Sequence, residues 1–412
     1  MSSAVETHAE PDWYPEEDRG GRSRGGGLRS PERYAEYTRL RRECPVAFSD
    51  TPETHATLTR YADVSAAALD TARFRSDPST TPFIGMPLGD QIPITLNSPE
   101  HGLFRRMLNR YFRPDRMAAL EPLIRRYAVE HIEALLAAGE ADVNPTLCRP
   151  VSAQALTALL NLPEEAAREL LDHWQIMLDT EYDVEKFNDV MFGVFAQYAG
   201  VVVAQRRAAP LDPDDDMISG VLATEINGSK LTDDQVIKIA MAMIAAGHFT
   251  TAETLGSAIH RVATVPGLQE ELRSRPDLIP AAVEEMIRLD LPLHELGRLA
   301  TTDVELHGRT IPRGCPVGLN FAAANRDPEA FDNPDEFVLD RSQNRHLGFG
   351  HGVHKCVGAP LARLEMRVVL EEILARTTAI ELADQPLNDV GLLGGGFERV
   401  PVRLRSAADR DN

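Results

Sequence analysis

The sequence has few cysteines and no long apolar run, and both absences limit what kind of protein it encodes. Four of the 412 residues are cysteines, and no two of them have the spacing of a disulfide framework or an iron–sulfur cluster. No stretch of about 18 apolar residues occurs, so no membrane-spanning segment is predicted. The N-terminus, residues 1–18, lacks the basic and apolar regions of a secretory signal. We therefore expect a cytoplasmic protein that is not bound to a membrane.

Positive charge is also scarce. Lysine and arginine number 43 against 63 aspartates and glutamates, which gives a net charge of -20. This balance argues against nucleic-acid binding through the bulk surface, because the phosphate backbone repels an acidic protein. The chain also lacks the glycine-rich fingerprints of flavin and nicotinamide enzymes. The hydrophobic share of 43% is that of an ordinary globular protein.

The chain is predicted to consist of a short leader and one domain. Residues 1–29 are polar and rich in glycine and arginine, which indicates a disordered leader. No linker or internal repeat divides residues 30–412. A serine, a proline and an acid predict a helix over residues 30–43. The segments Val46–Ser49 and Ala56–Arg60 are short and extended, and they are predicted to pair as a hairpin.

The helix that the sequence predicts most clearly begins near residue 233. Thr232 and Gln235 have the spacing of a capping box, and the apolar run that follows predicts a helix buried on nearly all sides. The pattern continues to about Val262. A glycine in the middle of a helix costs about 1 kcal/mol relative to alanine, so Gly247 needs a packing or functional reason.

One decapeptide is the most informative part of the chain: Phe-Gly-His-Gly-Val-His-Lys-Cys-Val-Gly, residues 349–358. It places Cys356 in a glycine-rich loop directly before a predicted helix, Ala359 to Ala375. The N–H groups at a helix N-terminus stabilise a thiolate, and glycines let the backbone approach a flat ligand. Cysteine thiolate is one of the few axial ligands that proteins offer to haem iron.

The decapeptide resembles the haem-binding signature of the cytochrome P-450 family, Phe-Gly-x-Gly-x-His-x-Cys-x-Gly, with every fixed position filled. The resemblance extends over roughly residues 30–404. It implies a mainly α fold, a helical prism with a smaller β-rich part to which Thr310–Leu319 and Arg399–Leu404 would contribute strands. It further implies haem b, iron-protoporphyrin IX, between two central helices. Its axial thiolate would come from Cys356, with Phe349 and Gly358 as further cofactor contacts.

A second segment, residues 246–251, resembles the oxygen-binding segment of the family, Ala-Gly-x-acid-Thr. By this resemblance Gly247 makes room for dioxygen, and the hydroxyl of Thr250 supports the protonation that breaks the O–O bond. The acid is missing, since Phe249 stands in its place. Glu253 follows at i+4 on the same helix face and is one candidate for the missing carboxylate. Protons delivered by water or by the substrate are the alternatives.

Haem carries two propionates, and their burial requires cationic partners. By resemblance these partners are His101, Arg105, Arg298 and His354. His101 and Arg105 lie at i, i+4 on a predicted helix, so their side chains share one face.

Glu285 and Arg288 lie at i, i+3, a spacing that on its own is usual for a solvated surface pair. The segment from Phe331 to Arg341 resembles the part of the family that adds a second arginine to this pair, here Arg341. The resemblance gives the three residues a structural role in the core beside the haem.

The family resemblance implies a bacterial-type haem-thiolate monooxygenase that inserts one oxygen atom of dioxygen into an organic substrate. We expect a monomer, a small or medium-sized substrate from secondary metabolism or catabolism, and electrons from a ferredoxin and its ferredoxin reductase. Basic residues near the signature either form a docking patch for an acidic ferredoxin or are charges of a solvated face: Arg105, Arg106, Arg110, Arg113, Arg116, Lys355 and Arg363.

Two alternatives remain open at this level. Phe249 raises the possibility of a peroxide-using haem-thiolate enzyme, because peroxide bypasses the missing acid. The other alternative is a haem sensor or carrier without catalysis. The resemblance predicts a mostly apolar pocket, with His294 and Glu295 as polar exceptions that either orient a polar or amine-bearing group or form a surface turn. Its predicted walls are Phe83, Met86, Met177, Met191, Phe192 and Phe397.

Overall fold

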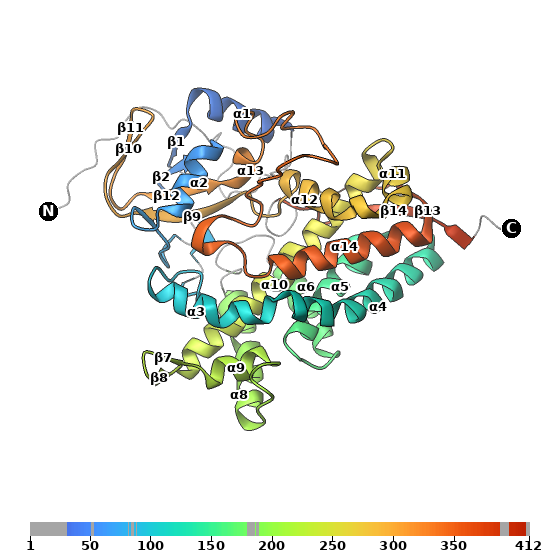
Figure 1. Cartoon of the computed structure of the whole chain (residues 1–412), viewed down its shortest axis with the longest axis horizontal. Helices are drawn as coiled ribbons and strands as arrows, with labels where there is room; N and C mark the ends of the chain where they lie inside the picture. The colour runs from blue at the N-terminus through green and yellow to red at the C-terminus, as the bar shows by residue number, and fades with distance from the viewer. Residues whose placement is uncertain are drawn as a thin grey trace.

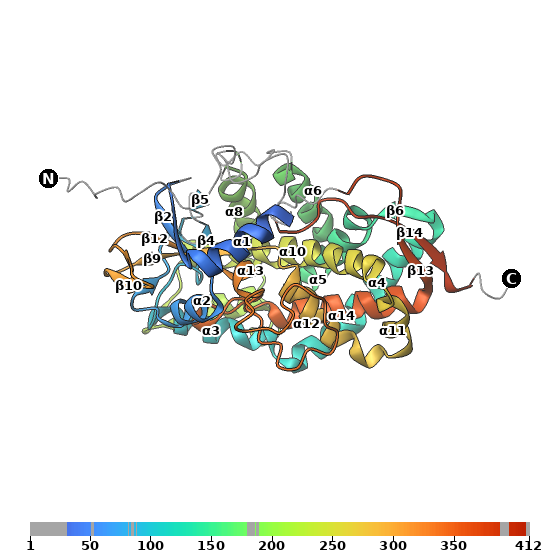
Figure 2. The same cartoon turned by 90° about the horizontal axis from the view of Figure 1, so that it is seen from above.

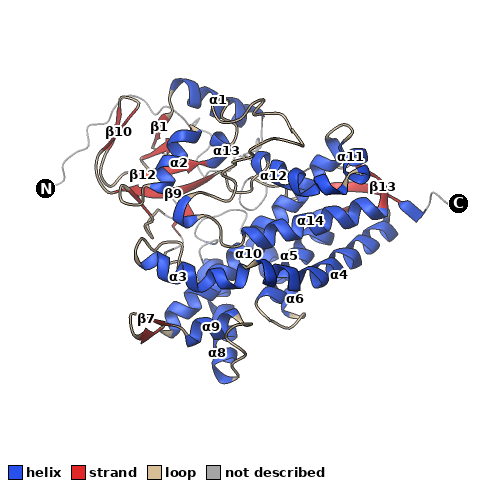
Figure 3. Ribbon diagram, viewed as in Figure 1, coloured by secondary structure: helices blue, strands red, loops and turns tan. Residues whose placement is uncertain are grey.

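The computed structural model describes residues 31–50, 53–80, 82–83, 86–87, 89–178, 186, 189–387 and 395–408. The predicted leader lies outside these residues. The chain is mainly helical, and the strands of its larger sheet lie together on one side of the molecule, as Figure 1 and Figure 3 show. A mainly α fold with a smaller β-rich part is therefore confirmed.

Helices form most of the regular structure of the described residues. They are α1 (Pro31–Glu43), α2 (Tyr61–Leu69), α3 (Glu100–Asn109), α4 (Pro114–Ala138), α5 (Arg149–Leu159), α6 (Ala166–Leu178), α8 (Ala196–Ala208), α9 (Met217–Ala223), α10 (Asp233–Thr264), α11 (Leu268–Ser274), α12 (Ile279–Leu289), α13 (Phe321–Ala324) and α14 (Ala359–Arg376). Single π turns are η3 (Asn144–Cys148) and η4 (Met191–Phe195), and short 3₁₀ turns are η2 (Arg110–Phe112), η5 (Pro276–Leu278) and η6 (Gly352–His354).

The longest described helix, α10, runs through the middle of the protein (Figure 1 and Figure 2). It begins at the predicted capping box, where the Thr232 hydroxyl accepts from the Gln235 N–H at 3.3 Å and the Gln235 side chain accepts from the Thr232 N–H at 3.0 Å. The helix packs against α5, α8, α12 and α14. The prediction of a long helix buried on most sides is confirmed.

The strands form one larger and several small sheets. The five-stranded sheet has the order β1-β2-β12-β9-β3, in which β12 pairs with β2 in parallel and the other pairs are antiparallel. The predicted hairpin is its β1–β2 pair. The other sheets are β13-β14-β6, β10-β11, β4-β5 and β7-β8.

The strand bounds of the larger sheet are β1 (Val46–Ser49), β2 (His55–Leu58), β3 (Phe74–Arg75), β9 (Glu295–Ala300) and β12 (Pro316–Asn320). Those of the smaller sheets are β4 (Pro82–Phe83), β5 (Met86–Pro87), β6 (Glu140–Asp142), β7 (Glu225–Ile226), β8 (Ser229–Lys230), β10 (Val304–Leu306), β11 (Arg309–Ile311), β13 (Thr377–Leu382) and β14 (Pro401–Ser406).

The segment Thr310–Leu319 is not one continuous strand. β11 ends at Ile311, and β12 begins at Pro316 in a different sheet. Between them Pro312 removes a backbone donor, and Gly314 has a φ of 84°, which the left-handed region allows to glycine at little cost. The chain turns here, so the first part of the predicted strand belongs to the β10-β11 sheet and the second part to the five-stranded sheet.

Two apolar cores hold these elements. One lies among the helices and includes most of the buried side chains of α4, α5, α10 and α14. The other joins α1, α2 and α13 to the five-stranded sheet. Among the helices of the described residues, none combines the length and the hydropathy that a membrane crossing needs.

Candidate functional site

The cysteine of the signature lies where the sequence places it, at the turn between η6 and α14. The Cys356 N–H donates to the Phe349 carbonyl at 2.8 Å, which closes the loop. Gly350 and Gly352 both have a φ of 70°, a conformation that strains other residues. A β-carbon at Gly352 would also lie 2.5 Å from the Ala68 carbonyl oxygen of α2. The glycines of the motif are therefore required by the fold of the loop.

The Cys356 side chain is exposed. The surrounding protein raises the pKa of the Cys356 thiol. The backbone N–H groups of Gly358 and Ala359 and the charges of Arg105 and Arg363 oppose this rise. These donors and charges favour the thiolate, the form of cysteine that binds metal.

The centre of α10 is open in contrast to the rest of the helix. Ala246 is exposed and Thr250 half-buried, one turn apart, whereas the residues on either side of this stretch are mostly buried. α10 runs through the middle of the protein (Figure 2). The exposure of these two side chains within it therefore indicates an internal opening beside the helix. The Thr250 hydroxyl donates to the Ala246 carbonyl at 3.2 Å. Thr250 thus presents a hydroxyl at the opening.

Gly247 has a packing reason as well. A β-carbon there would lie 2.7 Å from Cδ1 of Leu156 in α5, so any other residue at 247 would require the Leu156 side chain to shift. The glycine lets α5 and α10 approach each other beside the opening.

The four residues assigned to the propionates come from three separate segments and form one group. The imidazole rings of His101 (α3) and His354 (η6) lie 4.3 Å apart, and His354 Nε2 lies 3.2 Å from the Ser76 hydroxyl. Arg298 of β9 and Arg105 of α3 complete what we call the cationic cluster: His101, Arg105, Arg298 and His354. Arg105 Nε donates to Asn109 at 2.8 Å.

The cationic cluster has an unbalanced charge. Burial, Arg105 and Arg298 lower the pKa of His101 to about 4. Burial, Arg298, His101 and Arg105 lower the pKa of His354 to about 2, and burial lowers that of Arg298 to about 10. Within the described part of the chain, no carboxylate pairs with any of the four. The cluster therefore suits a dianionic ligand, and two propionates fit this requirement.

Glu253 lies on the same side of α10 as Ala246 and Thr250, at i+3 from Thr250. It is buried, and a β-carbon at Gly396 would lie 2.7 Å from its Oε2, so the glycine makes room for the carboxylate. Burial lowers the pKa of Arg149 on α5, and the charges of Asp142 and Glu253 oppose this. Arg149, which the sequence did not single out, is thus the cation beside Glu253.

Phe249 lies in a different environment. It is 4% exposed and packs between Trp174, Phe195 and His248, with ring centroids at 4.6, 5.7 and 4.1 Å. The position that holds an acid in the family pattern is therefore part of an aromatic cluster.

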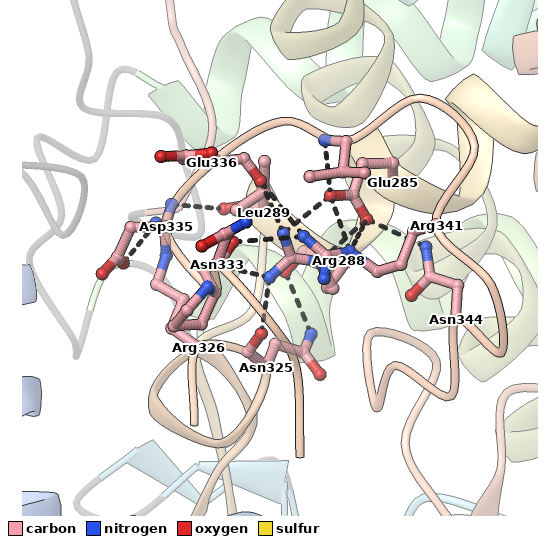
Figure 4. A network of polar contacts seen from close by, with 12 residues as sticks. Glu285, Arg288, Leu289, Asn325, Arg326, Asn333, Asp335, Glu336, Arg341 and Asn344 are labelled. Carbon is pink, nitrogen blue, oxygen red and sulfur yellow. Dashed lines mark hydrogen bonds and ion pairs between the residues drawn. The ribbon is translucent and has the colours of Figure 1, made fainter. Parts of the chain in front are cut away.

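The pair Glu285–Arg288 is buried in the core, as the family resemblance implied, and is not the solvated surface pair that its spacing alone would suggest. Both side chains have no exposed area, and Arg288 Nη2 lies 2.7 Å from Glu285 Oε1 (Figure 4). Arg341 supplies the second guanidinium at 3.0 Å, as predicted. Arg288 also donates to the carbonyls of three loop residues: Asn325 at 2.8 Å, Pro334 at 2.6 Å and Glu336 at 2.9 Å. One arginine thus fixes α12 to the loop that leads toward the signature.

Glu365 could not be predicted from the sequence, where it has the pattern of a solvated residue of α14. It is fully buried, and burial raises its pKa well above the ordinary value of 4.5, opposed by the Ser152 hydroxyl. The same hydroxyl lies 3.2 Å from the His248 carbonyl of α10. Glu365 therefore lies near the central helix as a neutral carboxyl group.

We expect Glu365→Gln to make stability less dependent on pH. Between the ordinary pKa and the raised one, Glu365 is protonated in the folded protein and ionised in the unfolded chain, so the unfolded chain binds fewer protons and the free energy of unfolding falls as pH rises. The slope is at most about 1.4 kcal/mol per pH unit. Glutamine cannot ionise and removes this slope. Unfolding midpoints of both proteins between weakly acidic and neutral pH test this, and parallel curves would contradict it.

The structure describes the side chains of three predicted pocket residues: Phe397, His294 and Glu295. Phe397 packs on His260 of α10, with ring centroids 4.6 Å apart. His294 is buried, not in a surface turn, and its Nδ1 lies 3.1 Å from the Tyr37 hydroxyl. Glu295 packs over Gly318, and burial raises its pKa to about 7. The side chains of Phe83, Met86, Met177, Met191 and Phe192 lie outside the described residues.

The predicted basic patch is largely neutralised. Arg116 pairs with Asp215 at 2.6 Å, Arg113 with Asp115 at 3.2 Å, and Arg363 holds Glu284 with two contacts of 2.6 and 2.8 Å. Arg110 donates to the Pro213 carbonyl at 3.0 Å. Within the described residues, Arg105, Arg106 and Lys355 are the members without an ion pair. The interpretation as a broad basic surface is therefore corrected to a few exposed charges.

The chain matches the family model described as Cytochrome P450 over residues 145–277 and 275–390. Mycinamicin IV hydroxylase/epoxidase of Micromonospora griseorubida is 33% identical over 387 residues, which cover 91% of this chain and 94% of that protein. Erythromycin C-12 hydroxylase of Saccharopolyspora erythraea is 35% identical over 361 residues, with coverages of 84% and 89%.

Solved structures agree with these matches. A mutant of P450 EryK in complex with erythromycin B has a TM-score of 0.82 and 31% identity, over 92% of this chain and 98% of that chain. CYP108D1 from Novosphingobium aromaticivorans has a TM-score of 0.81 and 30% identity, over 92% and 95%. The fold expected from the signature is confirmed.

Proposed function

This chain belongs to the cytochrome P450 family and is a monooxygenase; from that premise we propose that it inserts one oxygen atom of dioxygen into a small or medium-sized organic substrate, with electrons from an external ferredoxin system. The observation that carries this proposal is the exposed Cys356 thiol together with a cationic cluster that lacks a counter-charge.

The cofactor that fits these residues is haem b. Cys356 would supply the axial thiolate, and His101, Arg105, Arg298 and His354 would bind the propionates. When bound, haem supplies the activation of dioxygen, while the protein positions the substrate and manages protons. The buried network of Glu285, Arg288 and Arg341 keeps the loop before Cys356 in place.

Proton transfer is assigned to the open face of α10. The Thr250 hydroxyl can donate one hydrogen bond and accept others. In the described state it donates to Ala246, and it can rotate toward a ligand in the opening. Glu253 lies one turn further along this face, beside Arg149. A carboxylate there can pass a proton to the hydroxyl through water.

Thr250→Ala should raise the share of electrons lost as hydrogen peroxide several-fold while leaving the rate of iron reduction nearly unchanged. Glu253→Gln should have a similar effect, because an amide keeps the shape but cannot relay a proton. Thr264→Ala is the matched control, since the Thr264 hydroxyl makes the same bond to a carbonyl one turn back, at 2.8 Å, but at the end of α10. Peroxide released per NADPH consumed is the measurement. Unchanged values in both variants would mean that protons arrive through water or the substrate.

His101→Ala and Arg298→Ala should speed haem loss by about tenfold, the effect of losing roughly 1.4 kcal/mol of binding free energy. Arg116→Ala is the control for Arg298→Ala, because it also removes an arginine, but one paired with Asp215. Transfer of haem to an excess of a haem-scavenging protein gives the rates. Equal rates in the three variants would remove the assignment of the cationic cluster to propionates.

The electron donor is proposed to dock where η6 meets α2. Leu69 and Val353 are exposed by 59% and 42%, and the two segments touch at Gly352. Lys355 adds an exposed charge two residues further on. A small apolar centre beside a cation suits a partner with an acidic rim.

Turnover with two oxidant systems tests the proposed function. A ferredoxin, its reductase and dioxygen should support product formation, and Lys355→Glu should slow reduction most at low salt. Product formed with hydrogen peroxide but not with ferredoxin and dioxygen would favour a peroxide-using enzyme, the reading that Phe249 suggests. Haem binding without product from either system would favour a sensor or carrier.

The substrate class is proposed from the relatives. Two of them, by their names, act on mycinamicin IV and on erythromycin. We therefore place the substrate among secondary metabolites. Difference spectra recorded while candidate metabolites are added would identify it, because displacement of the iron's sixth ligand reports binding directly.

A further inference from the structure

Phe249 makes ring contacts that join three parts of the chain. Its ring lies 4.6 Å from that of Trp174 at 61°, and 5.7 Å from that of Phe195 at 73°. These are edge-to-face arrangements within the favourable range of separations, and such pairs stabilise beyond the burial of their area. Trp174 is 2% exposed and Phe195 is fully buried. The contacts are therefore part of the core.

The partners of Phe249 belong to the elements on either side of the segment between residues 179 and 188. Trp174 lies in the last two turns of α6, and Phe195 is the last residue of η4. Phe249 itself lies next to Thr250 on α10. One side chain of the central helix thus holds the end of α6 and the start of the following helical segment.

A charged group faces this cluster from a third helix. The Arg149 guanidinium of α5 lies 5.0 Å from the centroid of the Trp174 ring and donates to the Glu398 carbonyl at 3.2 Å. The charges of Asp142, Glu253 and Glu398 also act on it. The Arg149 guanidinium therefore already has a hydrogen-bond acceptor and three acidic neighbours. A carboxylate at position 249 would lie among aromatic rings, and its desolvation would not be offset.

We propose that Phe249 is a positioning residue: it fastens α6 and η4 to α10 and so sets the shape of the substrate pocket. This inference rests on the proposed function for the identity of the pocket. Aromatic packing, and not proton transfer, is the task of this position, and the carboxylate of the central helix lies one turn further on at Glu253.

Hydrogen exchange of the haem-loaded protein tests directly whether Phe249 holds α6 and η4 against α10. Phe249→Ala should increase amide exchange in peptides from α6 and from residues 189–195 by about tenfold, because local opening becomes easier when the rings separate. Phe74→Ala is the matched control: it removes the same side chain at the same 4% exposure, but from the core of the five-stranded sheet. It should leave these peptides unchanged.

Two results would overturn the proposal. Exchange of α6 unchanged in Phe249→Ala would show that the ring does not hold the helix. Equal acceleration in both variants would show general destabilisation instead of a local contact. Neither result depends on catalysis. Failure of the proposed function would instead appear as a haem protein without thiolate ligation or monooxygenase turnover, with the exchange pattern intact.

A second readout separates positioning from proton transfer. The affinity for 4-phenylimidazole, an azole that binds haem iron from the pocket side, should fall by about tenfold in Phe249→Ala, which corresponds to roughly 1.4 kcal/mol. Phe249→Leu, which keeps apolar contact, should recover most of this affinity. Phe249→Asp should weaken azole binding as the alanine variant does, without improved coupling to dioxygen. Improved coupling in Phe249→Asp, with unchanged azole affinity, would contradict the proposal.

Discussion

Replacing Cys356 by serine is expected to abolish the absorption band of the reduced carbon monoxide complex at about 450 nm, which depends on thiolate ligation, and to abolish monooxygenase turnover. A serine hydroxyl has a much higher pKa than a thiol and does not supply the charged sulfur that haem iron binds. The loop itself should persist, because its closing hydrogen bond joins the backbone N–H of residue 356 to the Phe349 carbonyl. The fold of the variant should therefore be retained.

Cys44→Ser is the matched control for this prediction. Arg309 Nη1 lies 2.8 Å from the Cys44 sulfur, and a serine hydroxyl can accept from the same guanidinium. The control removes a thiol that is far from the signature in the sequence. It should keep both the absorption band of the reduced carbon monoxide complex and the monooxygenase turnover. A Cys356→Ser protein that retained the band would show that another residue binds the iron.

Arg288→Lys is expected to destabilise the protein by about 3 kcal/mol, because lysine cannot make the forked contact to Glu285 and leaves buried carbonyls unpaired, each at a cost of about 1–3 kcal/mol. Arg288 donates twice to Glu285, at 2.7 and 2.8 Å, and to three backbone carbonyls (Figure 4). The single ammonium of lysine cannot reach all these acceptors. The loop that leads to the signature should loosen, and haem content should fall with it.

The comparison is with Arg39→Lys. Arg39 pairs with Glu36 at the same i, i+3 spacing and the same 2.7 Å, but its side chain is 41% exposed. Water replaces a lost contact there, so the change should cost at most about 1 kcal/mol. Thermal unfolding midpoints measure the loss of stability in both variants, and the haem-to-protein absorbance ratio measures their haem content. Similar losses in the two would mean that burial does not strengthen the Arg288 pair.

The features that could be predicted from the sequence are local ones. The capping box at Thr232, the hairpin of β1 and β2 and the helix after Cys356 each depend on residues close together in the chain. Proline and glycine positions also carry local information. The break at Pro312 and Gly314 could have been predicted from it, but Thr310, Ile311 and Val317 on either side favour strands and made the segment resemble a single one. The wider fold followed from resemblance to a family and not from periodicity.

What the sequence could not provide are contacts between distant segments. Glu365 and Arg149 look like residues of solvated helix faces, and their burial depends on how α14, α5 and α10 pack. Likewise, the arginines near residue 110 looked like a docking patch until the structure placed partners such as Asp215 beside them. Phe249 could be recognised as a departure, but the rings that surround it come from elements about 50 to 75 residues earlier in the chain.

The central claim is that Cys356 binds haem iron as a thiolate. The most direct test is the absorption spectrum of the purified protein after reduction with dithionite in the presence of carbon monoxide. Thiolate ligation predicts a band at about 450 nm. A band at about 420 nm, as for iron bound by a neutral imidazole, in a freshly prepared and fully folded sample would contradict the account.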